Sequence, residues 1–365
     1  MVGPPTFIRA MTLNTLIRSI WVVLHRLRSA SLQGEVWDGE FVTRYLVTGG
    51  AGFIGSHLVD QLVASGHSVM AIDDLSTGRH DNLREHLGNH GFEFILGSVL
   101  NEDLVEDAVR RADVVLHLAA AVGVNLIVER PLESLATNIR GSEVVLEKCH
   151  KYGRKVLVTS TSEIYGKNTS DALQEDDDRV LGSPRKTRWS YSEAKAIEEV
   201  LAHAYWRQKG LPTVIVRLFN TVGPRQVGHY GMVVPRLVEQ ALRNAPLTVF
   251  GTGEQKRCFG HVSDISRAIL ALLAHEQAEG GVFNVGATAE ISINELANRI
   301  LEVTSSSSTI THIPYDQAYE SGFEDMERRR PDTARLEKLT GWTPEKNLDD
   351  IITDVMLDLQ SRIKT

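Results

Sequence analysis

The chain has 365 residues, of which 42% are hydrophobic and 24% charged, a globular composition with room for one large or two coupled domains. Its formal net charge of −8 lacks the basic excess of a nucleic-acid-binding domain, so we expect no nucleic-acid partner. No apolar run reaches the roughly 18 residues that a membrane-spanning helix needs, so none is predicted.

The sequence contains two cysteines, Cys149 and Cys258. They are too few and too far apart in sequence to predict a disulfide scaffold or a metal site. We therefore expect no bound metal, and a reducing cytoplasmic location fits this cysteine content.

Residues 1–43 form a separate N-terminal extension in which apolar side chains recur at helical spacing, predicting an amphipathic helix. The pattern permits contact with a membrane surface or a partner. We favour a helix that packs on its own subunit, or a translation start placed too far upstream. Arg18 interrupts the apolar stretch, so no secretory signal is expected. The recurring apolar residues are Leu13, Leu16, Ile17, Ile20, Leu24 and Leu27.

From residue 44 onward, short apolar strands alternate with helical stretches. This alternation predicts an α/β fold of Rossmann type, a doubly wound parallel sheet covered on both faces. Such sheets bind ligands at the carboxyl ends of their strands. The predicted strands cover 45–48, 67–72, 92–96, 114–118, 155–159 and 213–217, and the predicted helices include 53–65, 139–152 and 192–208.

The rhythm changes after residue 223. Helices are predicted over 233–244, 265–275 and 293–304, with a short strand at 247–250. This half therefore reads as a smaller, mixed α/β domain.

A glycine-rich turn follows the first strand and opens the first helix. Gly49, Gly52 and Gly55 allow a tight turn that brings the backbone close to a pyrophosphate at the helix N-terminus. Asp73 ends the second strand, about 20 residues further on, where an acidic side chain accepts the ribose hydroxyls and favours NAD over its 2′-phosphorylated form. The expected NAD contacts are Gly49, Gly52, Phe53, Ile54, Gly55, Asp73, Asp74, Ala119 and Lys195.

These motifs divide the chain by expected task. Residues 44–222 are predicted to form the NAD-binding domain, to which 260–278 return. Residues 223–365 are predicted to form most of a substrate-binding domain.

Tyr191 and Lys195 lie four residues apart in a helical stretch, so their side chains face the same way. We expect the ammonium to lower the tyrosine pKa from its usual value of ~10 and make Tyr191 a general base. That base would take a proton from a sugar hydroxyl while NAD takes the hydride from the same carbon. Alone the spacing also fits a solvated surface helix; the glycine turn upstream strengthens the catalytic interpretation.

Thr161 and Glu163 follow the fifth predicted strand, at the edge where the nicotinamide would lie. Thr161 is placed to orient the reacting hydroxyl, and Glu163 brings a carboxylate beside the substrate. The alternative for Glu163 is a loop or helix-capping carboxylate.

Together these motifs resemble the extended short-chain dehydrogenase/reductase family of nucleotide-sugar epimerases, dehydratases and decarboxylases. The resemblance covers roughly residues 44–360. It rests on segments 48–55, 71–78, 117–120, 191–195, 217–225 and 253–264.

The resemblance implies roles for further residues. Lys195 would bond the nicotinamide ribose, Asn220 and Arg225 would contact the sugar diphosphate region, and Arg257 would grip a diphosphate oxygen with its guanidinium. Ser98 departs from the family pattern, which usually has an aspartate contacting adenine there. The implied substrate is a nucleotide-diphosphate sugar.

All members of this family oxidise the sugar at C4 to a transient ketone, and the following step differs between them. Thymidine-diphosphate hexose dehydratases resemble a Thr-Asp-Glu pattern, and here Ser162 occupies the position of the aspartate. This difference argues against that class. Thr161-Ser-Glu163 is similar to UDP-glucuronate decarboxylases and to GDP-mannose 4,6-dehydratases. Arg329, within 328–332, resembles the arginine that decarboxylases place near the substrate carboxylate.

UDP-glucuronate decarboxylation is therefore the preferred interpretation. The long stretch before Tyr191 also resembles the decarboxylase half of the bifunctional enzyme of the aminoarabinose lipid A pathway. The segment 231–236 also resembles UDP-sugar 4-epimerases, which remain the alternative. A GDP-mannose-type dehydratase is the third interpretation, and a non-enzymatic NAD sensor or scaffold is the last. The resemblance also implies a homodimer in which helices near 134–152 and 192–208 form a four-helix contact.

Overall fold

The computed structural model describes residues 36–37, 40–121, 131–186, 189–228, 232–318, 326 and 328–363. The chain divides into two compact units, Met1–Thr43 and Arg44–Thr365. In the first unit, strand β1 (Val36–Trp37) pairs antiparallel with β2 (Glu40–Phe41). The amphipathic helix predicted within 1–43, and any membrane contact it makes, lies outside the described residues.

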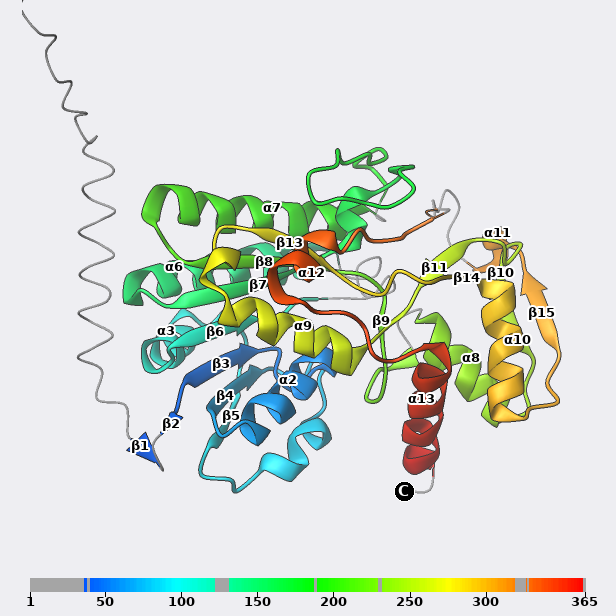
Figure 1. Cartoon of the computed structure of the whole chain (residues 1–365), viewed down its shortest axis with the longest axis horizontal. Helices are drawn as coiled ribbons and strands as arrows, with labels where there is room; N and C mark the ends of the chain where they lie inside the picture. Colours follow the sequence, from blue (N-terminus) through cyan, green and yellow to red (C-terminus); the bar gives the residue numbers. More distant parts are fainter. Residues whose placement is uncertain are drawn as a thin grey trace, which may run out of the picture. The chain divides into compact units, whose positions relative to one another are not determined.

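The second unit is built on a seven-stranded sheet in the order β13-β8-β7-β6-β3-β4-β5, and every pairing in it is parallel (Figure 1). Its apolar strands are buried on both sides, as expected for a sheet between two helical layers. This confirms the predicted Rossmann-type α/β fold. The strands are β3 (Arg44–Thr48), β4 (Ser68–Asp73), β5 (Phe92–Leu96), β6 (Val114–His117), β7 (Lys155–Thr161), β8 (Thr213–Leu218) and β13 (Val282–Val285).

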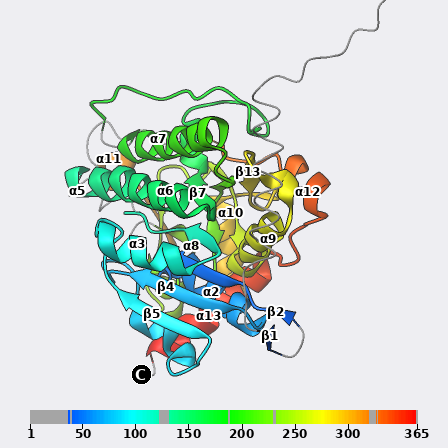
Figure 2. The same cartoon turned by 90° about the vertical axis from the view of Figure 1, so that its left-hand side faces the viewer.

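Two helical layers cover this sheet (Figure 2). On one face, α2 (Phe53–Ala64), α9 (Val262–Ala274) and α12 (Ala334–Thr340) share a hydrophobic core with the strands. On the other face, α3 (Glu102–Arg111), α6 (Gly141–Tyr152) and α7 (Ser190–Ala204) bury a second core. Strand β13 and helix α12 were not predicted. Although both belong to the C-terminal part of the chain, β13 is an edge strand of the sheet and α12 packs against it.

The two long predicted helices are composite. The helix predicted over 139–152 begins earlier, as α5 (Pro131–Leu135), and continues through a wide turn, η2 (Ala136–Arg140), into α6. Helix α7 ends in a similar wide turn, η5 (Tyr205–Lys209). Left-handed glycines, Gly153 and Gly210, then end both segments, as is common at helix C-termini.

The C-terminal part has its own small core, in which α8 (Val233–Leu242), α10 (Ile293–Thr304) and α13 (Leu348–Ile363) pack on β10 (Leu247–Phe250). Strand β10 pairs with β15 (Ile310–Ile313). The boundary between an NAD-binding and a substrate-binding domain stays a prediction, because residues 44–365 form one compact unit. The remaining short elements are η1 (His80–His86), η3 (Ser162–Tyr165), β9 (Thr221–Val222), β11 (Lys256–Cys258), β12 (Gly260–His261), η7 (Glu276–Ala278), β14 (Glu290–Ser292) and α11 (Tyr315–Ala318).

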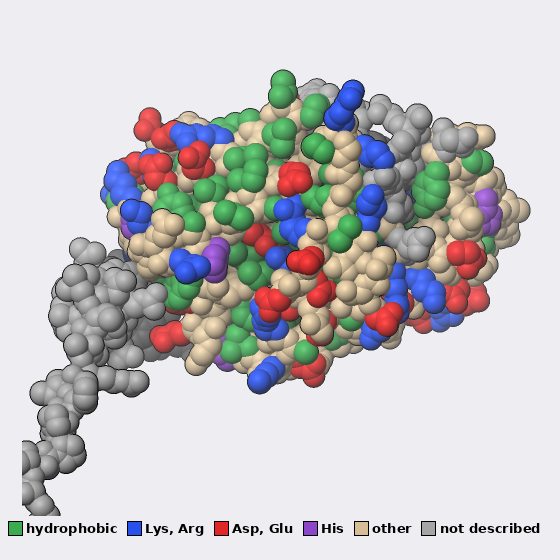
Figure 3. Space-filling model, turned by 90° about the horizontal axis from the view of Figure 1, so that it is seen from above, with side chains coloured by type: hydrophobic (Ala, Val, Ile, Leu, Met, Phe, Trp, Pro, Cys, Tyr) green, Lys and Arg blue, Asp and Glu red, His purple; other side chains and the backbone are tan. Residues whose placement is uncertain are grey.

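Acidic and basic side chains of the described residues are interspersed over the face seen in Figure 3. Within the described ranges, every helix is too short or too polar to cross a bilayer.

Candidate active site

One cavity of about 610 Å³ lies along the carboxyl edge of the sheet. It is lined by residues at the ends of β3, β4, β6, β7 and β8, by the start of α7, and by segments of the C-terminal part. The cavity brings together all the predicted site residues, which come from distant parts of the sequence: Gly49, Gly52, Phe53, Ile54, Gly55, Asp73, Asp74, Ala119, Thr161, Glu163, Tyr191, Lys195, Asn220, Arg225, Arg257 and Arg329.

The glycine turn can be made only by glycine at two positions. Gly49 has φ +70°, and a Cβ on it would lie 2.8 Å from the backbone nitrogen of Ala119. A Cβ on Gly55 would lie 2.1 Å from the carbonyl oxygen of Gly49. Among the described residues no side chain caps the N-terminus of α2, and its first turn holds no acidic residue. The first-turn amides are thus open to an anion such as the pyrophosphate of NAD.

Asp73 braces the glycine turn from the end of β4. Its carboxylate accepts hydrogen bonds from the backbone amides of Ala51, at 3.0 Å, and Leu75, at 2.8 Å. Burial raises the pKa of Asp73, while these hydrogen bonds oppose the change. A carboxylate has about four acceptor sites, so capacity remains for the ribose hydroxyls. The contact with ribose stays a prediction.

Lys195 is buried in α7, where its Nζ donates to the carbonyl oxygen of Thr159 at 3.0 Å and to Glu198 Oε2 at 2.9 Å. Burial raises the pKa of Tyr191 well above its usual value, and the charges of Glu198 and Glu163 raise it further. The predicted lowering of the tyrosine pKa by Lys195 is therefore wrong for the protein without ligands. The main reason is that burial disfavours the charged phenolate; Glu198, which the sequence interpretation missed, also raises the pKa of Tyr191 and balances the ammonium charge of Lys195.

Thr161 and Glu163 are placed by the end of β7 and the turn η3. The strand continues to Thr161, two residues beyond its predicted end, and the Thr161 hydroxyl accepts from the Glu163 amide at 3.2 Å. The Glu163 carboxylate forms an ion pair with Arg329, 2.8 Å from its Nη1. The same Nη1 donates to the Ser162 hydroxyl at 3.2 Å. The backbone amide of Glu163 thus takes part in the N-terminal cap of η3, whereas its carboxylate pairs with Arg329.

The long stretch between Glu163 and Tyr191 forms backbone hydrogen bonds with the segment that contains Arg329. The Leu173 amide donates to the carbonyl oxygen of Arg330 at 2.8 Å, and the Asp332 amide donates to the carbonyl oxygen of Leu173 at 2.9 Å. The residues that follow Arg329 are therefore fixed by two backbone hydrogen bonds to Leu173, which is far away in the sequence.

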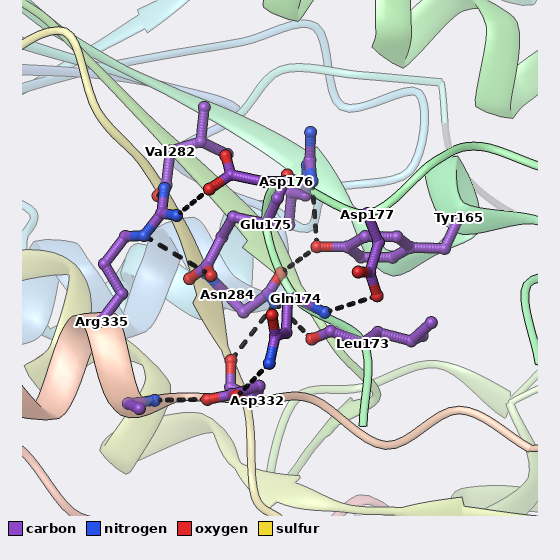
Figure 4. Close-up of polar contacts among 12 residues, drawn as sticks. Tyr165, Leu173, Gln174, Glu175, Asp176, Asp177, Val282, Asn284, Asp332 and Arg335 are labelled. Carbon is purple, nitrogen blue, oxygen red and sulfur yellow. Dashed lines mark hydrogen bonds and ion pairs between the residues drawn. The ribbon is translucent and has the colours of Figure 1, made fainter. Parts of the chain in front are cut away.

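Asn284 of β13 lies between the partners that hold this arrangement together (Figure 4). It is fully buried; its side-chain amide donates to Leu173 O at 2.8 Å, and its Oδ1 accepts from the Tyr165 hydroxyl at 2.7 Å. Its backbone amide donates to Glu175 Oε1 at 2.9 Å. Asn284 thus connects the turn of Glu163 with the segment of Arg329. The only sign of this role in the sequence is that Asn284 is a polar residue within the apolar segment 282–285.

The predicted diphosphate ligands make internal contacts. The Asn220 side-chain amide donates to Cys258 O at 3.0 Å, and Arg257 is nearly buried with Nη1 donating to Lys256 O at 2.8 Å. Both residues line the cavity, and their substrate contacts stay predictions.

Arg225 differs from them. Its guanidinium forms an ion pair with Asp60 of α2 at 2.8 Å, and its backbone amide donates to Asp358 of α13 at 3.1 Å. Its charge is therefore already balanced, and it joins two helices beside the cavity. Its substrate contact stays a prediction.

The fold and the site define an NAD-binding α/β protein with a Tyr-x-x-x-Lys pair at the carboxyl edge of the sheet. The model of the NAD dependent epimerase/dehydratase family matches residues 45–286. The chain belongs to this family, and it is an NAD-dependent enzyme.

Among curated proteins, the chain is 42% identical to the UDP-N-acetyl-α-D-glucosaminuronate decarboxylase of Bacillus cytotoxicus over 302 residues, which cover 82% of this chain and 92% of that one. It is 35% identical to UDP-glucuronic acid decarboxylase 2 of Arabidopsis thaliana, over 88% of this chain and 69% of that one.

Among solved structures, the UDP-glucose 4-epimerase of Thermotoga maritima, in complex with UDP-glucose, is 32% identical with a TM-score of 0.79, covering 88% of this chain and 99% of that chain. The UDP-glucuronic acid 4-epimerase of Bacillus cereus, in complex with UDP-glucuronic acid and NAD, is 29% identical with a TM-score of 0.79, covering 87% and 99%. The predicted family, fold and cofactor are thus confirmed.

Proposed function

We propose that this enzyme decarboxylates a UDP-hexuronic acid through a C4 ketone, and that it is therefore a lyase. The Glu163–Arg329 ion pair carries the proposal, because it places a buried guanidinium in the same cavity as the Tyr191–Lys195 pair. A guanidinium matches a carboxylate by two parallel hydrogen bonds. Relatives named as uronate decarboxylases support the assignment.

In the first step Tyr191 takes the proton of the sugar C4 hydroxyl, which Thr161 orients by a hydrogen bond. Bound NAD supplies the hydride acceptor for the same carbon. Lys195 holds the nicotinamide ribose from the neighbouring turn of α7. The product of this step is a 4-keto uronic acid, which is a β-keto acid.

In the second step the substrate carboxylate takes the place of Glu163 on Arg329. The C5–C6 bond breaks, CO2 leaves, and the bonding electrons move into the C4 carbonyl to form an enolate. Displacement from Arg329 leaves the Glu163 carboxylate beside the substrate, where it takes up a proton from solvent, and we assign to it the transfer of that proton to C5. Return of the hydride to C4 and of a proton to its oxygen gives a UDP-pentose.

The substituent at C2 of the sugar separates two candidate substrates. UDP-glucuronate is the first candidate, since several relatives are named for it at 33–35% identity. UDP-N-acetylglucosaminuronate is the second candidate, and the relative at 42% identity favours it.

The direct test incubates the purified, NAD-loaded protein with each uronate and follows CO2 and the sugar product. A UDP-pentose or its 2-acetamido analogue, released with CO2, is the expected result. An epimerised uronate without CO2 would assign the chain to the 4-epimerases. Turnover of GDP-mannose alone would assign it to the GDP-mannose dehydratases, and no turnover of any UDP-, GDP- or dTDP-sugar would leave an NAD-binding sensor or scaffold.

We also propose that the enzyme is a cytoplasmic homodimer. Apolar side chains are exposed on α7 and α5, namely Ile197 at 41%, Val200 at 68% and Leu132 at 82%. These helices are the ones that the family resemblance assigns to the subunit contact. Both cysteines are buried and unpaired in the described structure, which fits a reducing compartment.

A further inference from the structure

A second carboxylate lies behind the catalytic pair. Glu198 follows Lys195 by three residues on α7, so the two side chains share one face of the helix. Glu198 is fully buried and Lys195 is 2% exposed, and their charged atoms are 2.9 Å apart. A buried pair of this kind holds its geometry tightly, because breaking it would leave an uncompensated charge.

A residue of the neighbouring helix α6 lies next to Glu198. Ser142 of α6 lies beside it and favours its ionised form, as Lys195 does, against the effect of burial, which raises the pKa of Glu198. The Ser142 hydroxyl is 2.8 Å from His117 Nε2, and His117 Nδ1 is 2.8 Å from the Thr48 hydroxyl. Hydrogen bonds thus link Thr48 of β3, His117 of β6 and Ser142 of α6, and this series ends beside the carboxylate.

The ammonium of Lys195 has three donors. Thr159 O and Glu198 Oε2 accept two of them, and the described residues provide no third hydrogen bond. One donor therefore remains for a ligand hydroxyl in the cavity, and the two occupied donors determine its direction.

We propose that Glu198 is a positioning residue that fixes the Lys195 ammonium at the cavity wall and, by its charge, restrains Tyr191 from ionising before substrate and cofactor are bound. The inference rests on the proposed role of Tyr191 as the general base.

The charges around Tyr191 can be counted element by element. Helix α7 contributes Glu198 and Lys195, and η3 contributes Glu163, whose charge is paired with Arg329. Strand β7 contributes Thr159, Ser160 and Thr161, which are uncharged. Strand β6 contributes His117, which neighbours Lys195 and whose pKa burial lowers to about 3, so that it is neutral. Helix α5, which packs on α7, contributes Glu133, which lines the same cavity. Removing the charge of Glu198 therefore leaves the Lys195 ammonium unbalanced beside the phenol.

The test replaces Glu198 by glutamine, which keeps an acceptor for Lys195 and removes only the charge. Ionisation of Tyr191 is measured by ultraviolet difference titration of the NAD-loaded full-length protein against the same protein carrying Tyr191→Phe. We expect the titration midpoint of Tyr191 to fall by about 1 pH unit in Glu198→Gln, because an unbalanced ammonium stabilises the phenolate. The acid limb of kcat/KM for the uronate should move to lower pH by the same amount.

The matched control is Glu193→Gln, the same change on the same helix at a half-exposed carboxylate that pairs with Arg179. Its midpoint should equal that of the wild type. Glu198→Asp, which restores the charge, should return the midpoint toward the wild-type value, and it replaces the glutamine variant if that one does not fold. The proposal would be overturned if the titration midpoint of Tyr191 in Glu198→Gln equalled that of the wild type. It would also be overturned if the midpoint in Glu198→Asp fell as far as complete loss of the charge predicts. The titration needs no turnover, so a protein inactive on every uronate refutes the proposed function without deciding this inference.

Discussion

At the scale of single residues, two cations of the site, Lys195 and Arg329, are balanced before any ligand is bound. Lys195 is balanced by Glu198 and Arg329 by Glu163, both within 3 Å. Under the proposed function, a substrate carboxylate competes with Glu163 for Arg329. We expect this competition to make binding selective for uronates, because a neutral sugar has no carboxylate that could take the place of Glu163.

Replacing Arg329 by glutamine tests this selectivity. We expect kcat/KM for CO2 release to fall roughly 10- to 100-fold, because hydrogen bonds to a charged group contribute about 1.5–3 kcal/mol. The control is Arg328→Gln, at a partly exposed guanidinium that pairs with Asp171 and Glu290 outside the cavity. Its CO2 release should stay within about twofold of the wild type. Equal losses in both variants would contradict a specific role for Arg329.

His117 predicts an acid-dependent loss of stability. Burial, with a smaller contribution from Lys195, lowers its pKa from 6.5 to about 3, so the unfolded chain binds a proton that the folded chain does not. The stability due to neutral His117 is present above pH 6.5 and is lost as the pH falls toward about 3, by about 1.4 kcal/mol per pH unit. Urea unfolding of the wild type and His117→Gln at several pH values measures the difference. Parallel stability curves for the two proteins would contradict the assignment.

At the scale of elements, a short strand from the C-terminal part connects the sheet with the catalytic edge. Strand β13 extends the sheet next to β8, and through Asn284 it ties η3 to the segment of Arg329. Figure 4 shows Asn284 between Tyr165, Leu173 and Asp332. The two residues proposed for decarboxylation are thus held against one common strand.

Replacing Asn284 by alanine should lower the free energy of unfolding by about 2–4 kcal/mol, because it leaves buried polar partners unsatisfied. It should also lower CO2 release more than it lowers NAD affinity, since the glycine turn lies on other strands. Chemical unfolding and NAD titration are the measurements. Asn298→Ala, on the exposed surface of α10, should change stability by less than about 0.5 kcal/mol. A neutral effect at Asn284 would show that η3 and the Arg329 segment hold without it.

At the scale of the whole molecule, one sheet edge gathers residues from Gly49 to Arg329 into a single cavity. Strand ends that meet at one edge place side chains from distant segments within contact of each other. The exposed apolar residues of α7 lie on the other side of that helix from its buried face, and we expect them to be covered in the dimer.

Replacing Val200 by aspartate tests the dimer. A charge within an apolar subunit contact should convert the protein to a monomer at micromolar concentration, as measured by sedimentation equilibrium. Leu357→Asp, at an exposed leucine of α13, introduces the same charge elsewhere and should leave the mass unchanged. A dimeric Val200→Asp protein, or a monomeric wild type, would exclude this contact.

What the sequence determined by itself is local. The glycine turn, the strand and helix periods and the four-residue spacing of Tyr191 and Lys195 follow from backbone sterics and helix geometry, which neighbouring residues set. Six of the seven sheet strands could be predicted for this reason. Asn220, Arg257 and Arg329 came from the resemblance to a known family, and their substrate contacts stay predictions.

The tertiary structure decided which charges meet. Arg329 reaches Ser162 across 167 positions, and Asn284 reaches Tyr165 across 119. Such pairings depend on the path of the whole backbone, and no local pattern encodes them. The same reason explains the wrong expectation at the catalytic pair. The spacing of Tyr191 and Lys195 is local, but the pKa of Tyr191 depends on burial, on Glu198 and on Glu163. Only the completed fold buries Tyr191 and brings Glu163 near it.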